Sequence, residues 1–282
     1  MIKIIRHQLW NQRRQNGWIF VELVIVSFFL WTVIDPIYVL TSNLALDPGY
    51  DEERAYALYM DYYDELHGKF DKAQDSVAIR QENLYRITRL VKTCPEVESF
   101  ALVTNARFPN CNSWNGGQYF NDTLKVHSQY YQFVQAEGGD VFRTFGMKDA
   151  KSGQIMSLPE DCAAREGVFV SERMAKELFG TADAVGKRVR YGDSTFHYKH
   201  RINEQPGNLL IQVNGKIPNH NWIQRMYMVT FRLKQNVDVA VFEKRFKAEV
   251  VPQLNVGNFY FTKLGRFADI RRQYENESGV TN

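Results

Sequence analysis

Residues 167–180 read GVFVSERMAKELFG, and this stretch carries most of the information about the fold. Its apolar triplet at 168–170 predicts a short buried strand, and Ser171 is a residue type that caps the first turn of a helix. Glu172 favours the positive end of that helix, and Gly180 suits the left-handed position that ends it. The apolar face of the helix comprises Met174, Ala175, Leu178 and Phe179. A turn at Gly186 then leads into another strand, so the stretch predicts a structural unit without a catalytic motif.

A long apolar segment, WIFVELVIVSFFLWTVIDPIYVL, occupies residues 18–40. It has the length of about 20 residues that a helix needs to cross a bilayer, and no signal-peptide cleavage motif follows it. We therefore expect an uncleaved membrane anchor. Glu22 lies one turn inside the segment, where it can reach the headgroups or face another helix, and Asp35-Pro36 should kink or end the helix near its outer face. The aromatic residues expected at the membrane interfaces are Trp18, Trp31 and Tyr38.

Positive charge is concentrated ahead of this segment. The formal net charge is +3, and Lys3, Arg6, Arg13 and Arg14 all precede the first acidic residue. By the positive-inside rule, residues 1–17 form a basic, amphipathic cytoplasmic segment, and everything after about residue 40 lies outside the cytoplasm. The rest of the chain is close to neutral, which disfavours a nucleic-acid partner.

Two strand–helix–strand patterns flank the middle of the remaining chain. The first has strands at 54–60 and 97–104, and the second has strands at 225–233 and 258–264. The helices between them have apolar stripes made of Leu84, Ile87 and Val91, and of Val239, Phe242, Phe246 and Val250. Two such units can pair into one ferredoxin-like sheet with its helices on one face. We therefore expect an α+β fold, in which residues 106–222 form an insertion with short strands.

Cysteine and histidine patterns indicate no metal or catalytic site. The three cysteines have no CxxC spacing, and the two histidines of HYKH at 197–200 would face opposite sides of a strand. A disulfide between Cys94 and Cys111 in an oxidising compartment and free buried thiols are equally compatible with the sequence. No nucleophile elbow or Cys/His arrangement occurs, so we expect no cofactor, no metal ion and no catalytic residue.

Residues 168–189 resemble the extracytoplasmic core domain of MacB-type ABC transporter permeases, which belong to the FtsX-like superfamily. The positions that fit the family motif are Ser171, Glu172, Ala175, Lys176, Leu178, Phe179, Gly180, Asp183, Gly186, Lys187 and Val189. QYYQFVQAEGGDVFRTFGMKDAKSGQ at 129–154 and IQVNGKIPN at 211–219 are similar to flanking passages of the same family.

This resemblance implies a domain layout. The family has a first membrane helix, here 18–40, and an extracytoplasmic domain with a "porter" lobe of two βαβ units and an inserted "sabre" lobe. The porter lobe would comprise residues 45–105 and 223–272, and the sabre-like lobe residues 106–222. Residues 273–282 would begin a linker to a second membrane helix, which this sequence does not contain, so we expect a fragment of a four-helix permease or a degenerate gene product.

The resemblance also implies a function. Family permeases work in pairs in the bacterial inner membrane, on cytoplasmic ATPase subunits, and use ATP-driven motion for export or for mechanical work on the far side. The chain has no GxxxxGK[ST] motif, so ATP hydrolysis is expected in a separate subunit. The implied partners are that ATPase, a second permease copy, the lipid bilayer, and a periplasmic adaptor or cargo.

Two other interpretations share this layout. One is the extracytoplasmic ligand-sensing domain of a membrane receptor or sensor kinase, and the other is an enzyme tethered to the membrane. The fold of the outer domain discriminates between them, because a sensor would be a helical bundle or a PAS-like sheet with a ligand pocket. A permease would have two βαβ units with an inserted lobe.

Overall fold

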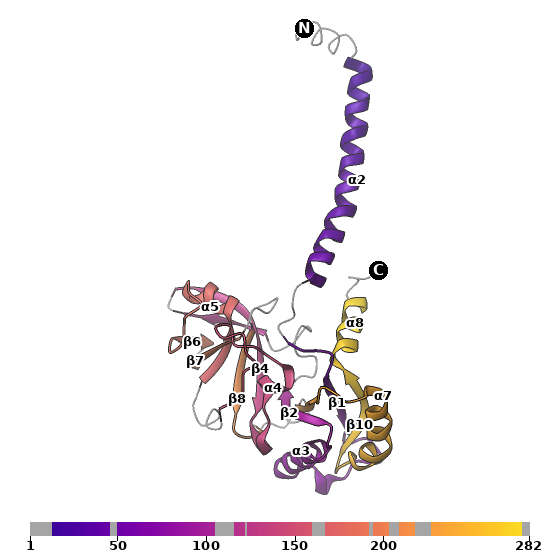
Figure 1. Cartoon of the computed structure of the whole chain (residues 1–282), viewed down its shortest axis with the longest axis vertical. Helices are drawn as coiled ribbons and strands as arrows, with labels where there is room; N and C mark the ends of the chain where they lie inside the picture. Colours follow the sequence, from indigo (N-terminus) through magenta and orange to yellow (C-terminus); the bar gives the residue numbers. More distant parts are fainter. Residues whose placement is uncertain are drawn as a thin grey trace. The chain divides into compact units, whose positions relative to one another are not determined.

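The apolar N-terminal segment forms one long helix, α2 (Arg13–Ala45), in the computed structural model (Figure 1). The structure describes residues 13–45, 50–104, 116–121, 123–159, 167–191, 194–202, 209–217 and 227–277. The chain divides into two units, Met1–Leu46 and Asp47–Asn282, and we call the second the C-terminal unit. Helix α2 continues past Pro36, so of the two expectations for Asp35-Pro36 a helix end is wrong, and a kink stays a prediction. A proline removes one main-chain donor, and the intact turns on either side maintain the helix.

Two interleaved βαβ units make the first part of the sheet. The strands β1 (Ala55–Tyr62), β2 (Val97–Thr104), β9 (Tyr227–Leu233) and β10 (Phe259–Arg266) lie in the order β10-β1-β9-β2. Neighbouring strands are antiparallel throughout. Helix α3 (Val77–Lys92) connects β1 to β2. Between β9 and β10 the chain forms α7 (Val239–Arg245), a π-helical turn (Phe246–Val250) and a 3-10 turn (Val251–Gln253). The ferredoxin-like arrangement predicted from the sequence is confirmed.

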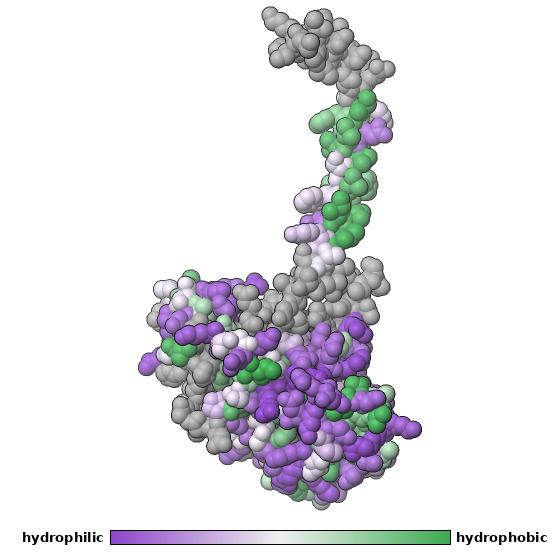
Figure 2. All heavy atoms as spheres, in the orientation of Figure 1, coloured by the Kyte–Doolittle hydropathy of each residue, from purple (hydrophilic) through white to green (hydrophobic). Residues whose placement is uncertain are grey.

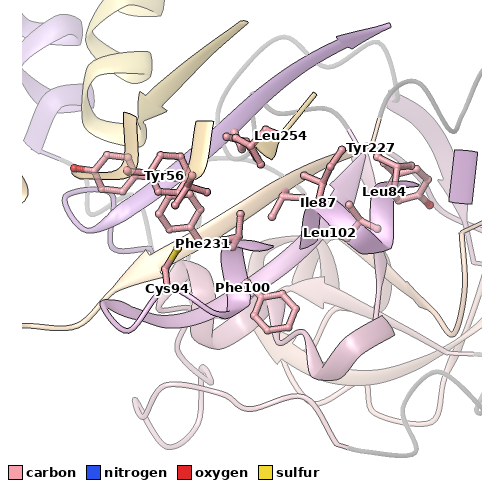
Figure 3. Packing of buried hydrophobic residues seen from close by; sticks show 14 of the residues in the cluster. Tyr56, Leu84, Ile87, Cys94, Phe100, Leu102, Tyr227, Phe231 and Leu254 are labelled. Atoms are coloured by element: carbon pink, nitrogen blue, oxygen red, sulfur yellow. The ribbon is translucent and has the colours of Figure 1, made fainter. Parts of the chain in front are cut away.

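The helices α3 and α7 cover one face of these four strands. Strand β9 is buried along its whole length, and its residues alternate between the two faces of the sheet. Tyr227 and Phe231 point to the helix face, where they pack with Tyr56 of β1 and with Leu84 and Ile87 of α3 (Figure 3). Because strand side chains alternate, the residues between them must pack on the opposite face, against other parts of the chain.

The middle of the chain continues the same sheet with six strands. They are β3 (Gly116–Phe120), β4 (Lys125–Val134), β5 (Gly167–Ser171), β6 (Arg188–Tyr191), β7 (Ser194–Ile202) and β8 (Leu209–Asn214). Their order is β4-β3-β6-β7-β5-β8, and β8 also pairs with β4, so the pairings close into a ring. Strands β4 and β7 have 10 and 9 residues, so the expectation of uniformly short strands is wrong. Of the Asn and Gly residues behind that expectation, the asparagines precede β3 and the two glycines begin it, so they do not interrupt the later strands.

Short helices cover both faces of this second part. Helix α5 (Glu172–Phe179) packs on Val168 and Val170 of β5, whereas α4 (Val141–Phe145) packs on Phe169 between them. The remaining elements are the 3-10 turns Lys72–Gln74 and Ala136–Gly138 and the helix α8 (Phe267–Glu277). Residues 273–277, expected to begin a linker, belong to α8, and the linker stays a prediction.

The insertion is joined to the flanking βαβ units through both the sheet and the core. Strand β2 pairs with β4 at Leu102↔Val134 and Val103↔Phe133. A shared core cluster contains Ala57, Val103, Phe133, Phe145, Phe169 and Met228. Ile217, which follows β8, is fully buried in the cluster beneath α3, and its carbonyl accepts a hydrogen bond of 2.7 Å from Gln81 Nε2. The two parts therefore move together unless this shared core is broken.

Candidate functional site

The residues expected to anchor the chain in a membrane lie on the surface of α2. Trp18, Trp31 and Tyr38 are 72%, 67% and 68% exposed, and Glu22, Asp35 and Pro36 are exposed as well. The window Gly17–Tyr38 has 22 residues and is long and apolar enough to cross a membrane. At about 1.5 Å per residue it extends roughly 33 Å, close to the thickness of a bilayer core. Figure 2 shows the predominantly hydrophobic surface of this helix, which requires apolar surroundings.

The motif residues form the strand–helix–turn unit around α5. Ser171 is the N-cap, and its Oγ accepts a hydrogen bond of 3.3 Å from the backbone amide of Met174. Gly180 is the C-cap with φ 67°, and its amide donates to the carbonyl of Lys176 at 2.8 Å. Glu172 forms an ion pair of 2.8 Å with Lys176. Ala175 and Leu178 are fully buried, Phe179 packs against the same cluster, and Gly186 and Lys187 are exposed in the turn before β6.

Cys94 is a buried free thiol at the end of α3. Its Sγ donates to the carbonyl of Leu90 at 3.6 Å, and burial raises the pKa of the thiol above its usual value. Cys111 lies outside the described residues, so the Cys94–Cys111 disulfide stays a prediction.

A cluster of charged side chains lies where the chain enters the C-terminal unit. We call it the junction cluster, and it comprises Asp51, Arg54, Glu98, Arg143 and Arg232. Arg54 Nη2 lies 3.2 Å from Asp51 Oδ2, and Arg54 Nη1 lies 3.4 Å from Glu98 Oε2. Arg143 Nε lies 3.6 Å from the other oxygen of Glu98. Three guanidinium groups thus share two carboxylates. These ion pairs join residues 50–54, which we call the entry segment, to β2, α4 and β9.

Arg232 is the buried centre of the junction cluster. It lies in β9 opposite two small residues, Ala55 and Ser99, and its side chain is only 3% exposed. Its Nη2 donates to the carboxylate of Asp51, and its Nε lies 3.7 Å from Glu98. Burial lowers the pKa of Arg232, and the Asp51 carboxylate opposes that effect. Among the described residues, no hydrogen-bond partner reaches the buried Nη1.

The close approach of Gly146 explains how this arginine fits. Gly146 is the C-cap of α4 with φ 63°, and a Cβ at this position would lie 2.5 Å from Arg232 Nη1. The sequence offered one signal for this site, an arginine near the end of an otherwise apolar, fully buried strand. Its partner Asp51 is 181 positions away in the chain, and no local pattern could have identified it.

The entry and the exit of the C-terminal unit lie side by side. Strand β1 begins next to the end of β10, with Tyr56 opposite Arg266. The amide of Ala268 in α8 donates to the carbonyl of Glu52 at 3.2 Å, and the amide of Asp51 donates to the carbonyl of Phe145 at 2.8 Å. The ring of Phe267 packs on that of Phe145 with a centroid distance of 5.2 Å. The entry segment is therefore in direct contact with both α4 and α8.

The charged groups of the junction cluster are paired with one another. Within the ranges that the structure describes, no three His, Cys, Asp or Glu side chains come together as metal ligands. The groups whose pKa values are shifted are separate tyrosines, arginines and Cys94, some of them buried and others, such as Arg89 and Tyr260, on the surface. Burial raises the pKa of Tyr56, for example, and the neighbouring Glu243 raises it further.

No protein-family model and no curated protein sequence matches the chain. Among solved structures, it is similar to the periplasmic region of MacB from Actinobacillus actinomycetemcomitans, with a TM-score of 0.50 and 14% identity. This match covers 81% of the present chain and 95% of the MacB region. The chain is also similar to the extracellular domain of the noncanonic ABC-type transporter YknZ from Gram-positive bacteria, with a TM-score of 0.47 and 11% identity, over 74% and 100% of the two chains. At these identities the likeness concerns the fold alone. The chain therefore carries the fold of the MacB periplasmic region.

Proposed function

We propose that this chain is a permease subunit of an ABC transporter, anchored by α2, whose C-terminal unit couples ATP-driven motion to export or mechanical work outside the cytoplasm. The observation that carries the proposal is the fold, which has two interleaved βαβ units and an inserted ring of strands and is similar to the fold of the MacB periplasmic region. The βαβ units do not form the helical bundle or PAS-like sheet expected of a ligand sensor. The proposed role is not enzymatic, and ATP would be hydrolysed by a separate cytoplasmic subunit.

The side of the membrane follows from the charge of the N-terminal segment. The positions Lys3, Arg6, Arg13 and Arg14 favour a cytoplasmic N-terminus, in the inner membrane of a bacterium. The C-terminal unit would then be extracytoplasmic, as the similar MacB region, which is periplasmic, is in that protein. We further propose that residues 45–105 and 223–272 act as a porter lobe and residues 106–222 as a sabre-like lobe.

The junction cluster supports a mechanical role. The entry segment is held to β2, α4, α8 and β9 by ion pairs and main-chain hydrogen bonds, so it cannot be displaced without moving the sheet. A rigid connection of this kind suits a domain that is moved from its membrane end. The proposed partners are a cytoplasmic ABC ATPase, a second permease copy and a periplasmic adaptor or cargo.

Membrane topology and ATPase coupling test the proposal together. In a full-length variant lacking the three natural cysteines, Leu66→Cys should react with a membrane-impermeant maleimide on intact spheroplasts, because Leu66 is 96% exposed. Gln8→Cys should react only after permeabilisation. The tagged chain should also co-purify with a P-loop ATPase and change its rate of ATP hydrolysis in nanodiscs.

Two results would contradict the proposal. Labelling of Gln8→Cys on intact spheroplasts, with protection of Leu66→Cys, would place the C-terminal unit in the cytoplasm. Co-purification with a histidine kinase, and with no ATPase whose rate the chain changes, would support the sensor interpretation instead.

A further inference from the structure

An open groove lies beside the C-terminal end of α5. Its volume is about 790 Å³, and its lining combines a phenyl ring, polar groups and cationic side chains. The lining residues are Asn121, Thr123, Phe179, Gly186, Lys187, Arg188 and Arg190. Three of these, Phe179, Gly186 and Lys187, belong to the motif that the sequence suggested to be purely structural.

The groove exists because β3 leaves its neighbour β6 early. The two strands pair at Phe120↔Arg190, and among the described residues this is their one paired position. The chain then turns, and the Asn121 side chain holds the turn in place. Its Nδ2 donates to the carbonyl of Leu178, and its Oδ1 accepts from the amides of Thr123 and Leu124 at 2.9 and 2.7 Å. The start of β6 is thereby left facing an open space between the turn and α5.

The described lining residues of the groove carry positive charge. Lys187, Arg188 and Arg190 are exposed, and no Asp or Glu is among the lining residues that the structure describes. Lys187 Nζ lies 5.1 Å from the centroid of the Phe179 ring. Two exposed apolar residues are sequence neighbours of the lining: Leu124, 48% exposed, follows Thr123, and Val185, 56% exposed, precedes Gly186. A complementary ligand would combine negative charge with apolar side chains.

We propose that this groove binds an extended acidic peptide segment of a partner protein. Carboxylates of the segment would pair with Lys187 and Arg188, and an apolar side chain would pack on Phe179. A small anion fits less well, because the cations are exposed to water and would hold it only weakly. A membrane surface fits less well too, because the cationic residues line a hollow and a flat surface could not reach into it.

The groove is independent of the permease assignment. A permease does not need a peptide site at this position, and a peptide could bind here whatever moves the domain. A negative result in the binding experiment would therefore not contradict the permease proposal. A negative result in the ATPase experiment would not contradict the peptide-binding proposal.

Binding can be measured by fluorescence anisotropy on the full chain in a neutral detergent. The probe is a fluorescein-labelled peptide of alternating Glu and Leu, and its counterpart carries Gln in place of Glu. Each exposed ion pair changes affinity by roughly 1.5- to 5-fold, so reversing two charges in K187E/R188E should weaken binding about tenfold or more. The matched control K244E/K247E makes the same charge change at exposed residues near α7 and should bind within about twofold of the wild type.

Two further measurements distinguish specific binding in the groove from misfolding of the variant and from non-specific electrostatic attraction. K187Q/R188Q removes the two charges without reversing them and should give an intermediate loss of affinity. A photo-crosslinker on the peptide should attach to residues 121–124 or 186–190. Equal binding of the Glu and Gln peptides, equal losses in the two charge-reversal variants, or crosslinks elsewhere would overturn the proposal. So would vesicles of phosphatidylglycerol that bind through Lys187 and Arg188 while the peptide does not.

Discussion

Replacing Gly146 by alanine would test whether Arg232 is as tightly enclosed as the structure indicates. Gly146 has φ 63°, and an added Cβ would lie 2.5 Å from Arg232 Nη1 and 3.1 Å from Asp51 Cβ. Gly180 offers a matched control, because it ends α5 with φ 67° and has nothing within 4 Å of the same added atom. Both alanines would suffer the same backbone strain, and only the alanine at position 146 would meet the junction cluster.

The expected difference between the two variants is large. Left-handed backbone costs an alanine about 1–2 kcal/mol at either position. Carbon atoms rest at about 3.5–4.0 Å from their neighbours, so the Arg232 guanidinium would have to withdraw by roughly 1 Å from its place beside Asp51. Disrupting a buried ion pair costs up to about 3–5 kcal/mol. We therefore expect Gly146→Ala to lower the free energy of unfolding by about 3–5 kcal/mol, and Gly180→Ala by about 1–2 kcal/mol.

Urea unfolding of the full chain in detergent, followed by pulse proteolysis, would measure both values. A third variant, Arg232→Met, removes the nitrogen that the new methyl group would meet, and Arg54 still neutralises Asp51. The double mutant Gly146→Ala/Arg232→Met should lose less free energy of unfolding than the sum of the two single mutants, by about 1 kcal/mol or more. Equal losses for the two glycine variants, together with additive behaviour in the double mutant, would refute this account of the packing.

Three further outcomes follow from single contacts. Asp238→Ala removes the N-cap of α7, because the Asp238 carboxylate accepts hydrogen bonds from two backbone amides at 2.9 and 3.1 Å. Thermal unfolding followed by circular dichroism should show a free energy of unfolding lower by about 1 kcal/mol. Leu178→Ala leaves a cavity at a fully buried position and should lower the free energy of unfolding, measured in urea, by about 2–5 kcal/mol. Val241→Ala, at a site 63% exposed, should change the free energy of unfolding by less than about 0.5 kcal/mol. The Cys94 thiol should react with a disulfide reagent only after unfolding, and its raised pKa should make stability fall above about pH 8.5, where the unfolded thiol loses its proton and the buried one keeps it. A Cys94–Cys111 disulfide would instead block that reaction in both states, and thiol counting under non-reducing conditions would reveal it.

Local sequence patterns were enough to identify most elements of the two βαβ units. The strand predicted at 97–104 is the strand observed, and the helix after Asp238 begins where its cap predicts. The unit around α5 could also be predicted, because its caps Ser171 and Gly180 interact with backbone groups only a few positions away. Propensity, capping and apolar periodicity are interactions between near neighbours, so a single sequence contains them in full.

Pairings between distant segments were beyond the reach of those patterns. The ring closed by β4 and β8, the continuity of the inserted strands with β2, and the groove left where β3 turns away from β6 all depend on strands far apart in sequence. The same is true of Arg232, which could be recognised as an unusual residue in a buried strand but not assigned to Asp51. Strand register and the pairing of buried charges are determined by tertiary packing, because the interactions that stabilise them form between surfaces that meet only in the folded state.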